Sequence, residues 1–320
     1  MERTDITSFP DALFDDLLPV LLDSIAPTFD EYVRRTAVDR WMLLSDYVVG
    51  APGRKNDAFV FTLVPGGHHL DSITKEMKLA ATRDIKDIAT VSDAMMRLLT
   101  DCRLHTFCFL INGNRRLIRD LPTARGWLDR SVTIIEQFAN ASELTELIAE
   151  FRGLRQRANA NGFKLRLVED MMLATTLSAF IIYFVSRIIP VVAHAWISDR
   201  DSITSAYGGI ARELHRINVN GFCERALGWS GPVSNATGDG TSWSDFLTRV
   251  PDYFAGTLSA IDLSTGSLAV DSQKYQQVLE GAVAGRESVS IVRLNLGIEG
   301  DRNIVRADVM QLRASHPLHP

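Results

Sequence analysis

Five short apolar runs with the composition of β-strands are spread along this chain, and the helical segments between them restrict the fold. The runs cover residues 41–49, 58–64, 105–111, 190–198 and 288–296. Only a turn-like segment rich in glycine and charged residues separates the first two runs, so they are expected to pair as an antiparallel hairpin. Early strands, then helices, a buried strand and further helices predict an α/β protein with one mixed sheet.

Helices are predicted for most of the remaining chain. The first one, over residues 10–38, places Leu13, Leu17 and Leu21 on one face and is interrupted by Pro27. Further helices are expected over 70–100 with a break near 90–92, over 123–187, over 202–217 and over 244–261. The predicted organisation is an N-terminal helical appendage (1–38), a central domain (39–265) with a helical insertion at about 123–187, and a C-terminal extension (266–320) with one strand and one helix.

A strongly apolar stretch extends from Met171 to Ile197, and its uncharged run ends at Ser186. A helix needs about 20 predominantly apolar residues to span a bilayer. The uncharged run is shorter than that, and Arg187 and Pro190 then interrupt it. We interpret the stretch as a buried helix followed by a buried strand, with membrane attachment as the weaker alternative.

The composition is that of an ordinary globular protein, with 46% apolar residues, 23% charged residues and a net charge of −5. This charge argues against a protein that coats nucleic acid, but metal ions or a local basic patch can supply the positive field of a nuclease. The segment Arg115-Arg116-Leu117-Ile118-Arg119 is one basic cluster, for which a solvated surface is the simpler interpretation. Three cysteines without metal or disulfide spacing, and an N-terminus unlike a signal peptide, predict a cytoplasmic protein.

Four aspartates stand at the ends of predicted elements. Asp46 closes the apolar residues 41–45 of the first strand, Asp199 and Asp201 follow the strand at 190–198, and Asp252 opens a small apolar helix. Carboxylates placed this way are expected to converge at one edge of the sheet, as in sites that hold divalent ions for phosphodiester chemistry. Each also has a simpler explanation. Asp46 can cap a turn, either Asp199 or Asp201 can cap the next helix (as can Ser202), and the helix dipole favours an acid at Asp252.

These segments resemble the bacterial family known as domain of unknown function 3800, which is placed among ribonuclease H-like folds. The resemblance is carried by four short motifs, which are Leu44-Ser45-Asp46, Lys75-Glu76-Met77-Lys78, Ala195-Trp196-Ile197-Ser198-Asp199 and residues 249–258. In the last motif, Asp252, Ala255 and Gly256 match the start of the family's closing helix. The matched positions run from 41 to about 262.

The resemblance implies a ribonuclease H-like mixed sheet flanked by helices and a metal-dependent phosphodiester reaction. It makes Asp46, Asp199 and Asp252 the candidate metal ligands, with Glu76 as a fourth. Mg²⁺ suits such an all-oxygen set, and Mn²⁺ can substitute for it. Lys78 is the candidate for stabilising phosphate charge. A metal-dependent nuclease or related phosphodiester-processing enzyme is therefore expected. Asp201, Glu169 and Asp170 are reserve ligands, and the simpler interpretation of Glu169 and Asp170 is the acidic first turn of the apolar helix.

A non-catalytic module that binds nucleic acid or protein on the same fold is the alternative. Asp46 is followed by Tyr47-Val48-Val49, where the family often has Glu-Ser-Gly, and Pro251 replaces a small residue. The acidic charge balance favours the same alternative. Turnover in the presence of Mg²⁺ or Mn²⁺ separates the two hypotheses.

Overall fold

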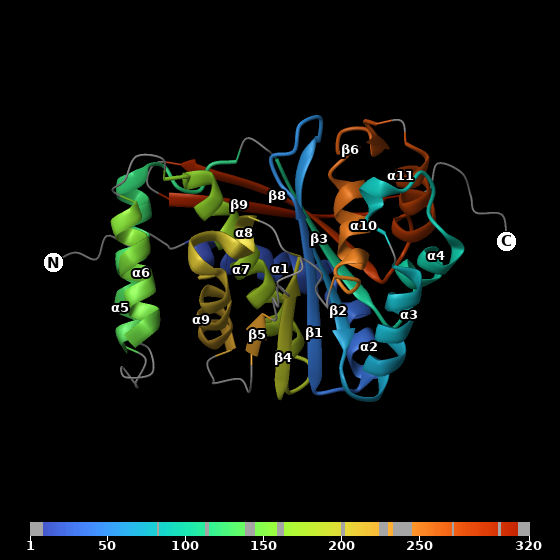
Figure 1. Ribbon diagram of the computed structural model, residues 1–320, viewed down its shortest axis with the longest axis horizontal. Coiled ribbons are helices and arrows are strands. Elements are labelled where there is room, and N and C mark those ends of the chain that lie inside the picture. Colours follow the sequence, from blue (N-terminus) through green and yellow to red (C-terminus); the bar gives the residue numbers. More distant parts are fainter. Residues whose placement is uncertain are drawn as a thin grey trace.

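A mixed sheet of seven strands lies at the centre of the computed structural model (Figure 1). The structure describes residues 9–81, 83–112, 115–137, 145–158, 163–199, 202–223, 230–232, 245–270, 272–299 and 302–312. The strands follow the order β5-β4-β1-β2-β3-β8-β9 across the sheet. They are β1 (Arg40–Val48), β2 (Asn56–Pro65), β3 (His105–Asn112), β4 (Ala193–Ser198), β5 (Ser230–Pro232), β8 (Val289–Glu299) and β9 (Arg302–Met310).

The sheet contains both parallel and antiparallel pairs of neighbouring strands. Strand β2 is antiparallel to both β1 and β3, whereas β4 is parallel to β1 and β5 is parallel to β4. On the other side, β8 is parallel to β3 and β9 is antiparallel to β8. The predicted hairpin of the first two strands is confirmed, and so is the α/β class with one mixed sheet flanked by helices.

Two apolar layers cover the two faces of the sheet, because side chains alternate along each strand. On β1, Trp41 and Leu43 belong to one layer, and Met42 and Leu44 belong to the other. The first layer includes helices α1 (Phe9–Ser24), α2 (Ala26–Thr36), α5 (Leu121–Gln137), α6 (Thr145–Arg157), α7 (Leu165–Ser186), α8 (Ser202–Ser205) and α9 (Ala211–Cys223). The second layer includes α3 (Leu70–Ala80), η2 (Ile85–Asp87), α4 (Asp93–Leu99), α10 (Arg249–Leu258), α11 (Gln273–Val278) and η4 (Leu279–Val283).

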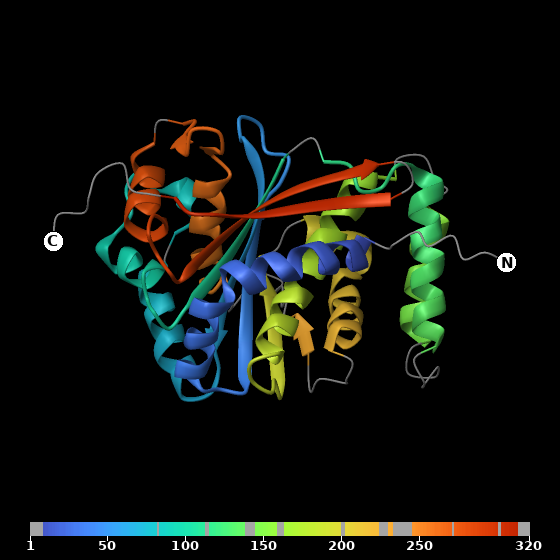
Figure 2. The same cartoon turned by 180° about the vertical axis from the view of Figure 1, so that it is seen from behind.

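The remaining short elements are η1 (Gly67–His69), η3 (Ala206–Gly208), β6 (Ile261–Asp262) and β7 (Ser267–Leu268). Strands β6 and β7 pair with each other outside the main sheet, just after α10. Figure 2 shows α1 crossing the back of the molecule beside β8 and β9. Helix α1 therefore covers the edge of the sheet that β8 and β9 form.

Helix α7 is buried among α1, α9 and the sheet. Among the residues that the structure describes, it is the one helix long and apolar enough to cross a membrane. Within this helix, 94% of the most apolar 18-residue stretch is nevertheless buried inside the protein. Packing of this kind is also typical of a core helix, where apolar surface on all sides finds protein partners.

Several elements differ from those predicted. The segment expected to form one helix over 202–217 is divided into α8 and α9, because Tyr207, Gly208 and Gly209 all have positive φ. The first helical region consists of two helices that meet at Ile25, with a proline in the first turn of the second. Strand β9 was not predicted, and it pairs with β8 from Glu299 and Arg302 inward.

Candidate functional site

Asp46 and Asp199 are neighbours at the carboxyl ends of two parallel strands. Ser45 on β1 pairs with Ser198 on β4, and the backbone N–H of Asp199 donates to the Ser45 carbonyl at 3.0 Å. The ladder therefore continues one step past the end of β4. Since adjacent strands lie about 4.8 Å apart, this register brings the two aspartates side by side.

Both aspartates also fall on the face of the sheet that α10 covers. Met42 and Leu44 precede Asp46 on alternate positions of β1, and they pack in the layer that contains α10. On β4, Ala195 and Ile197 contact the same layer, and Asp199 is the next alternate residue. Asp46 is 7% exposed and Asp199 is partly buried. The alternation of side chains thus directs two carboxylates to one side of the sheet edge.

Asp252 has a different environment, although it lies on α10. Its carboxylate accepts a hydrogen bond of 3.0 Å from the backbone N–H of Ile85 and is hydrogen-bonded to the Asp84 carboxyl group. Burial, followed by repulsion from Asp84, raises the pKa of Asp252 to about 7. Although burial acts in the opposite direction, hydrogen bonds from Lys86 hold the pKa of Asp84 below its ordinary value. Asp84 therefore carries the charge of the pair.

The rotation of α10 about its axis explains this placement. A Cβ built on Gly256, one turn after Asp252, would lie 2.9 Å from Cγ2 of Ile85. Asp252 and Gly256 thus share the side of α10 that packs on η2, whereas Val250 and Phe254 lie in the apolar layer over the sheet. The structure consequently brings Asp252 together with Asp84, not with Asp46 and Asp199.

Glu76 and Lys78 lie on the exposed side of α3. Ile73 and Met77 are the buried residues of this helix, and Glu76 and Lys78 flank Met77. The Glu76 carboxylate binds the Arg103 guanidinium at 2.5 Å. Both side chains therefore project to solvent, and the structure does not join them to the pair at the sheet edge.

Among the described residues, no group of three or more His, Cys, Asp and Glu side chains is placed to hold a metal ion. The predicted four-carboxylate cluster is therefore not assembled, while Asp201 lies outside the described residues. The Asp46–Asp199 pair still suits one ion. Mg²⁺ keeps several waters and takes one or two protein carboxylates together with substrate phosphate, and two adjacent aspartates can supply the carboxylates of such a set.

A buried ionic network that the sequence did not reveal lies on the face of the sheet opposite to α10. The Arg115 guanidinium is fully buried and binds the carboxylates of Asp57 and Asp170, and Arg166 also binds Asp57. The backbone N–H of Gly50 donates to Asp57 at 2.7 Å. Burial raises the pKa of Asp170 to about 6. Arg115 thus belongs to the interior and not to a solvated basic surface.

This network anchors the segment after β3 to the start of α7. The Glu169 carboxylate accepts hydrogen bonds from the backbone N–H groups of Leu117 and Ile118 at 2.7 and 2.6 Å. Glu169 therefore binds the backbone of this segment and Asp170 binds Arg115, so both acids have structural partners inside the fold. The sequence shows the two adjacent acids, Glu169 and Asp170, but it does not show that Arg115 is the basic residue beside them.

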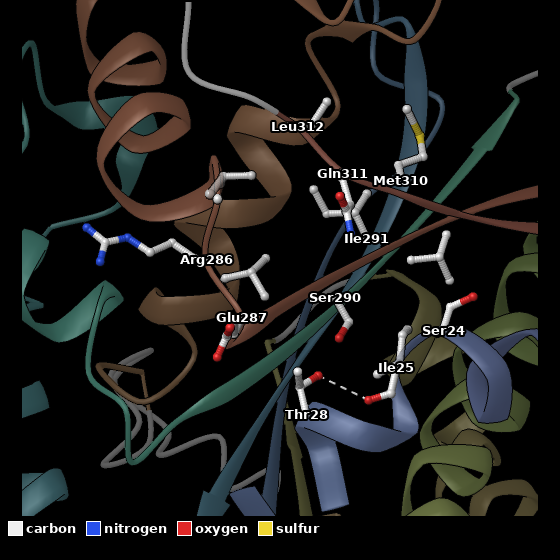
Figure 3. Close-up of a pocket in the computed structure, with 14 residues that line it drawn as sticks. Ser24, Ile25, Thr28, Arg286, Glu287, Ser290, Ile291, Met310, Gln311 and Leu312 are labelled. Atoms are coloured by element: carbon white, nitrogen blue, oxygen red, sulfur yellow. Dashed lines mark hydrogen bonds between the residues drawn. The ribbon is translucent and has the colours of Figure 1, made fainter. Parts of the chain in front are cut away.

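A cavity of about 430 Å³ lies between the α1–α2 junction and strands β8 and β9 (Figure 3). Thr28, Ser290 and Gln311 supply polar groups to its lining, and Ile25 and Ile291 supply apolar ones. None of the predicted site residues lines it. It belongs to the opposite end of the sheet from the Asp46–Asp199 pair.

The comparisons add no family to these observations. Searches against models of protein families, curated proteins and solved structures found no match.

Proposed function

We propose that this protein is a metal-dependent nuclease or related phosphodiester-processing enzyme with a ribonuclease H-like fold. The observation that carries the proposal is the placement of Asp46 and Asp199 on adjacent parallel strands with their side chains on one face. Two such carboxylates provide a binding site for one divalent cation, Mg²⁺ or Mn²⁺.

The order of elements supports the same proposal. A first strand ending in aspartate, an antiparallel second strand, a helix with the Glu-x-Lys element, a later strand ending in aspartate and a closing helix succeed one another as the resemblance implies. The closing helix, α10, packs on β1 and β2. The unit β3-β2-β1-β4-β5, with β2 antiparallel to both neighbours and β4 parallel to β1, supports the ribonuclease H-like interpretation.

In this proposal, Asp46 and Asp199 bind the cation and position it at the sheet edge. When bound, such an ion lowers the pKa of a coordinated water and stabilises negative charge on a phosphate oxygen. The partial burial of both aspartates limits the water around their carboxylates and strengthens their interaction with a cation. Asp252 is hydrogen-bonded to Asp84 and Glu76 binds Arg103, so neither is proposed as a ligand of this cation. With two carboxylate ligands, the proposal involves one ion and not two.

A cleavage assay tests the proposal. Single-stranded, duplex and hybrid oligonucleotides are incubated with the full chain in EDTA, Mg²⁺ or Mn²⁺. Asp46→Asn and Asp199→Asn are each expected to lower metal-dependent cleavage by roughly 100-fold, within the range for removing a group that acts in the transition state. Asp71→Asn, which changes an exposed acid on α3, is the matched control. Equal activity of wild type and both site variants would reject the proposal.

The non-catalytic binding module is the second candidate, and one observation favours it. Tyr47, which stands where the related family often has glutamate, faces away from α10 and its hydroxyl lies 2.7 Å from Oγ of Ser45. The position after Asp46 therefore supplies a structural hydrogen bond. Tight binding of nucleic acid or protein without turnover in Mg²⁺ or Mn²⁺ is the result that this candidate predicts.

A further inference from the structure

A second polar cavity, of about 220 Å³, lies at the carboxyl end of β4. Ser198, Thr204 and Arg212 contribute polar groups to its lining. Ser198 immediately precedes Asp199, and the Thr204 hydroxyl donates to the Asp199 carbonyl at 3.1 Å. Within the described part of the chain, the buried Ser198 hydroxyl has no hydrogen-bond partner. The cavity and the aspartate pair therefore meet at the same edge of the sheet.

An aromatic pair stands next to this cavity because of an unusual backbone turn. Tyr207 has φ of 52°, and Gly208 and Gly209 follow with φ of 84° and 83°. A left-handed conformation costs a non-glycine residue roughly 1 kcal/mol or more, and such strain often accompanies functional positions. Here it places the Tyr207 ring 5.7 Å from the ring of Phe163, and both rings are partly exposed.

Two cationic residues lie near Tyr207 of the aromatic pair, and a third lines the cavity. Arg157 interacts electrostatically with the Tyr207 phenol, which also hydrogen-bonds the backbone of Lys164. Arg212 lines the cavity itself. All three cationic residues are exposed, and no described carboxylate forms an ion pair with any of them. We call Arg157, Phe163, Lys164, Tyr207 and Arg212 the basic track.

The charge of the surrounding segment distinguishes it from the rest of the protein. Residues 116–165, a range that leaves out Arg115 and Arg166 of the buried network, contain eight Lys or Arg and six Asp or Glu, although the whole chain has a net charge of −5. A local excess of positive charge on an acidic protein concentrates a polyanion at one place. Helices α8 and α9 lie between the α5–α6 pair and β4 (Figure 1), so this excess borders the candidate site.

We propose that the basic track binds a single-stranded nucleic acid and directs it across the carboxyl end of β4. Arg157, Lys164 and Arg212 would contact successive phosphates, and unpaired bases would stack on Tyr207 and Phe163. Aromatic faces combined with a basic groove are typical of single-strand binding, because bases held in a duplex cannot reach such faces. The inference rests on the proposed function, since it names the substrate class of the same sheet edge.

Fluorescence anisotropy with labelled oligonucleotides of about 12 nucleotides, a length suited to such grooves, tests this inference. Single-stranded DNA, single-stranded RNA and duplex DNA are titrated with the full chain in EDTA, so that no cleavage occurs. We expect both single strands to bind more tightly than the duplex. The double variant Arg157→Glu/Arg212→Glu should weaken binding at least tenfold. It should also lower the slope of log affinity against log salt by roughly 1.4, since each phosphate contact contributes about 0.7.

Two further variants separate the contribution of stacking from that of charge. Phe163→Leu and Tyr207→Leu are each expected to weaken binding at least about fivefold, the lower end of measured stacking effects, with little change in the salt slope. Circular dichroism melting of every variant identifies any that has lost its fold. The Phe163 variant keeps the stacking prediction testable if the strained Tyr207 position does not tolerate leucine.

Lys75→Glu/Arg97→Glu is the matched control, because it makes the same change in charge at exposed positions of α3 and α4. It should leave affinity within about twofold, given screening over about 10 Å at 0.1 M salt. Equal weakening by both double variants, or tighter binding of the duplex, would overturn the inference. If the wild-type chain binds single strands as expected but cleaves none of them in Mg²⁺ or Mn²⁺, the nuclease is rejected and the basic track is retained. Metal-dependent cleavage by wild type that the track variants leave unchanged would do the opposite.

Discussion

The side-chain carboxyl groups of Asp84 and Asp252 are hydrogen-bonded to each other where η2 packs against α10. Arg249 and Lys86 form ion pairs with Asp84 at 3.0 and 2.9 Å, so the cations surround one member of the pair. The other member, Asp252, is the more deeply buried and retains the proton. Two carboxyl groups in contact ionise together only at a large electrostatic cost, which makes this contact a determinant of pH-dependent stability.

Asp252→Asn is expected to change that pH dependence. The pKa of Asp252 is about 7 in the folded protein and 3.8 as the reference value, so the folded state binds the extra proton between these values. Its stabilising effect is complete below about pH 4 and disappears as the pH rises through 7. Asparagine mimics the protonated form, so the free energy of unfolding of the variant should exceed that of wild type by roughly 4 kcal/mol at pH 8, given a shift of about three pKa units at 1.36 kcal/mol each.

Urea unfolding from pH 4 to pH 8 measures this difference. The exposed Asp87, also in η2, provides the control variant Asp87→Asn. Parallel pH profiles for wild type and Asp252→Asn would show that the Asp252 proton makes no contribution.

Arg115→Met should strongly destabilise the fold. It removes the buried cation that binds Asp57 and Asp170 and leaves two buried carboxylates with less compensation, which typically costs about 3–5 kcal/mol. The neighbouring Arg116 is exposed, and Arg116→Ala should change the free energy of unfolding by no more than about 0.5 kcal/mol. Chemical denaturation compares the two, and similar values for both variants would contradict the assigned role of Arg115.

Gly256→Ala should be destabilising by about 1–3 kcal/mol, as expected for overpacking, because its Cβ would lie 2.9 Å from Cγ2 of Ile85. Combining it with Ile85→Ala removes that methyl group and should recover part of the loss. A double-mutant cycle gives the coupling energy. Gly126→Ala on α5 is the control, since nothing lies within 4 Å of its added Cβ. Alanine there should stabilise the helix by about 0.5–1 kcal/mol; additive effects of the Gly256 and Ile85 changes would refute the proposed contact.

The parts of the site that follow from strand order were predictable from the sequence. Asp46 lies near the end of β1 and Asp199 directly follows β4, and the parallel pairing of the two strands places these positions together. The hairpin of β1 and β2 was equally clear, because a turn-like segment separates two apolar runs. These features depend on local composition and on alternation along a strand.

The predictions for the helical residues failed for a different reason. The sequence shows that Asp252 lies near the start of a helix, but the direction of its side chain depends on contact with Ile85, which is distant along the chain. The exposure of Glu76 and Lys78 was predictable in principle, because Ile73 and Met77 define the buried side of α3. Strand β9 escaped prediction because Arg306 and Asp308 interrupt its apolar pattern.

The pairing of β1 with β4 also has a consequence for the order in which the protein folds. Asp46 and Asp199 are separated by more than 150 residues of sequence, and that interval includes β2, β3 and the α5–α7 region. Contacts of such long range form slowly, because a large loop must close before they are gained. The proposed cation site would therefore be absent from any partly folded chain in which β4 has not paired with β1. Tight metal binding would therefore appear only once the central sheet has formed. Because the ion would bind the folded chain and not the unfolded one, it would raise the free energy of unfolding.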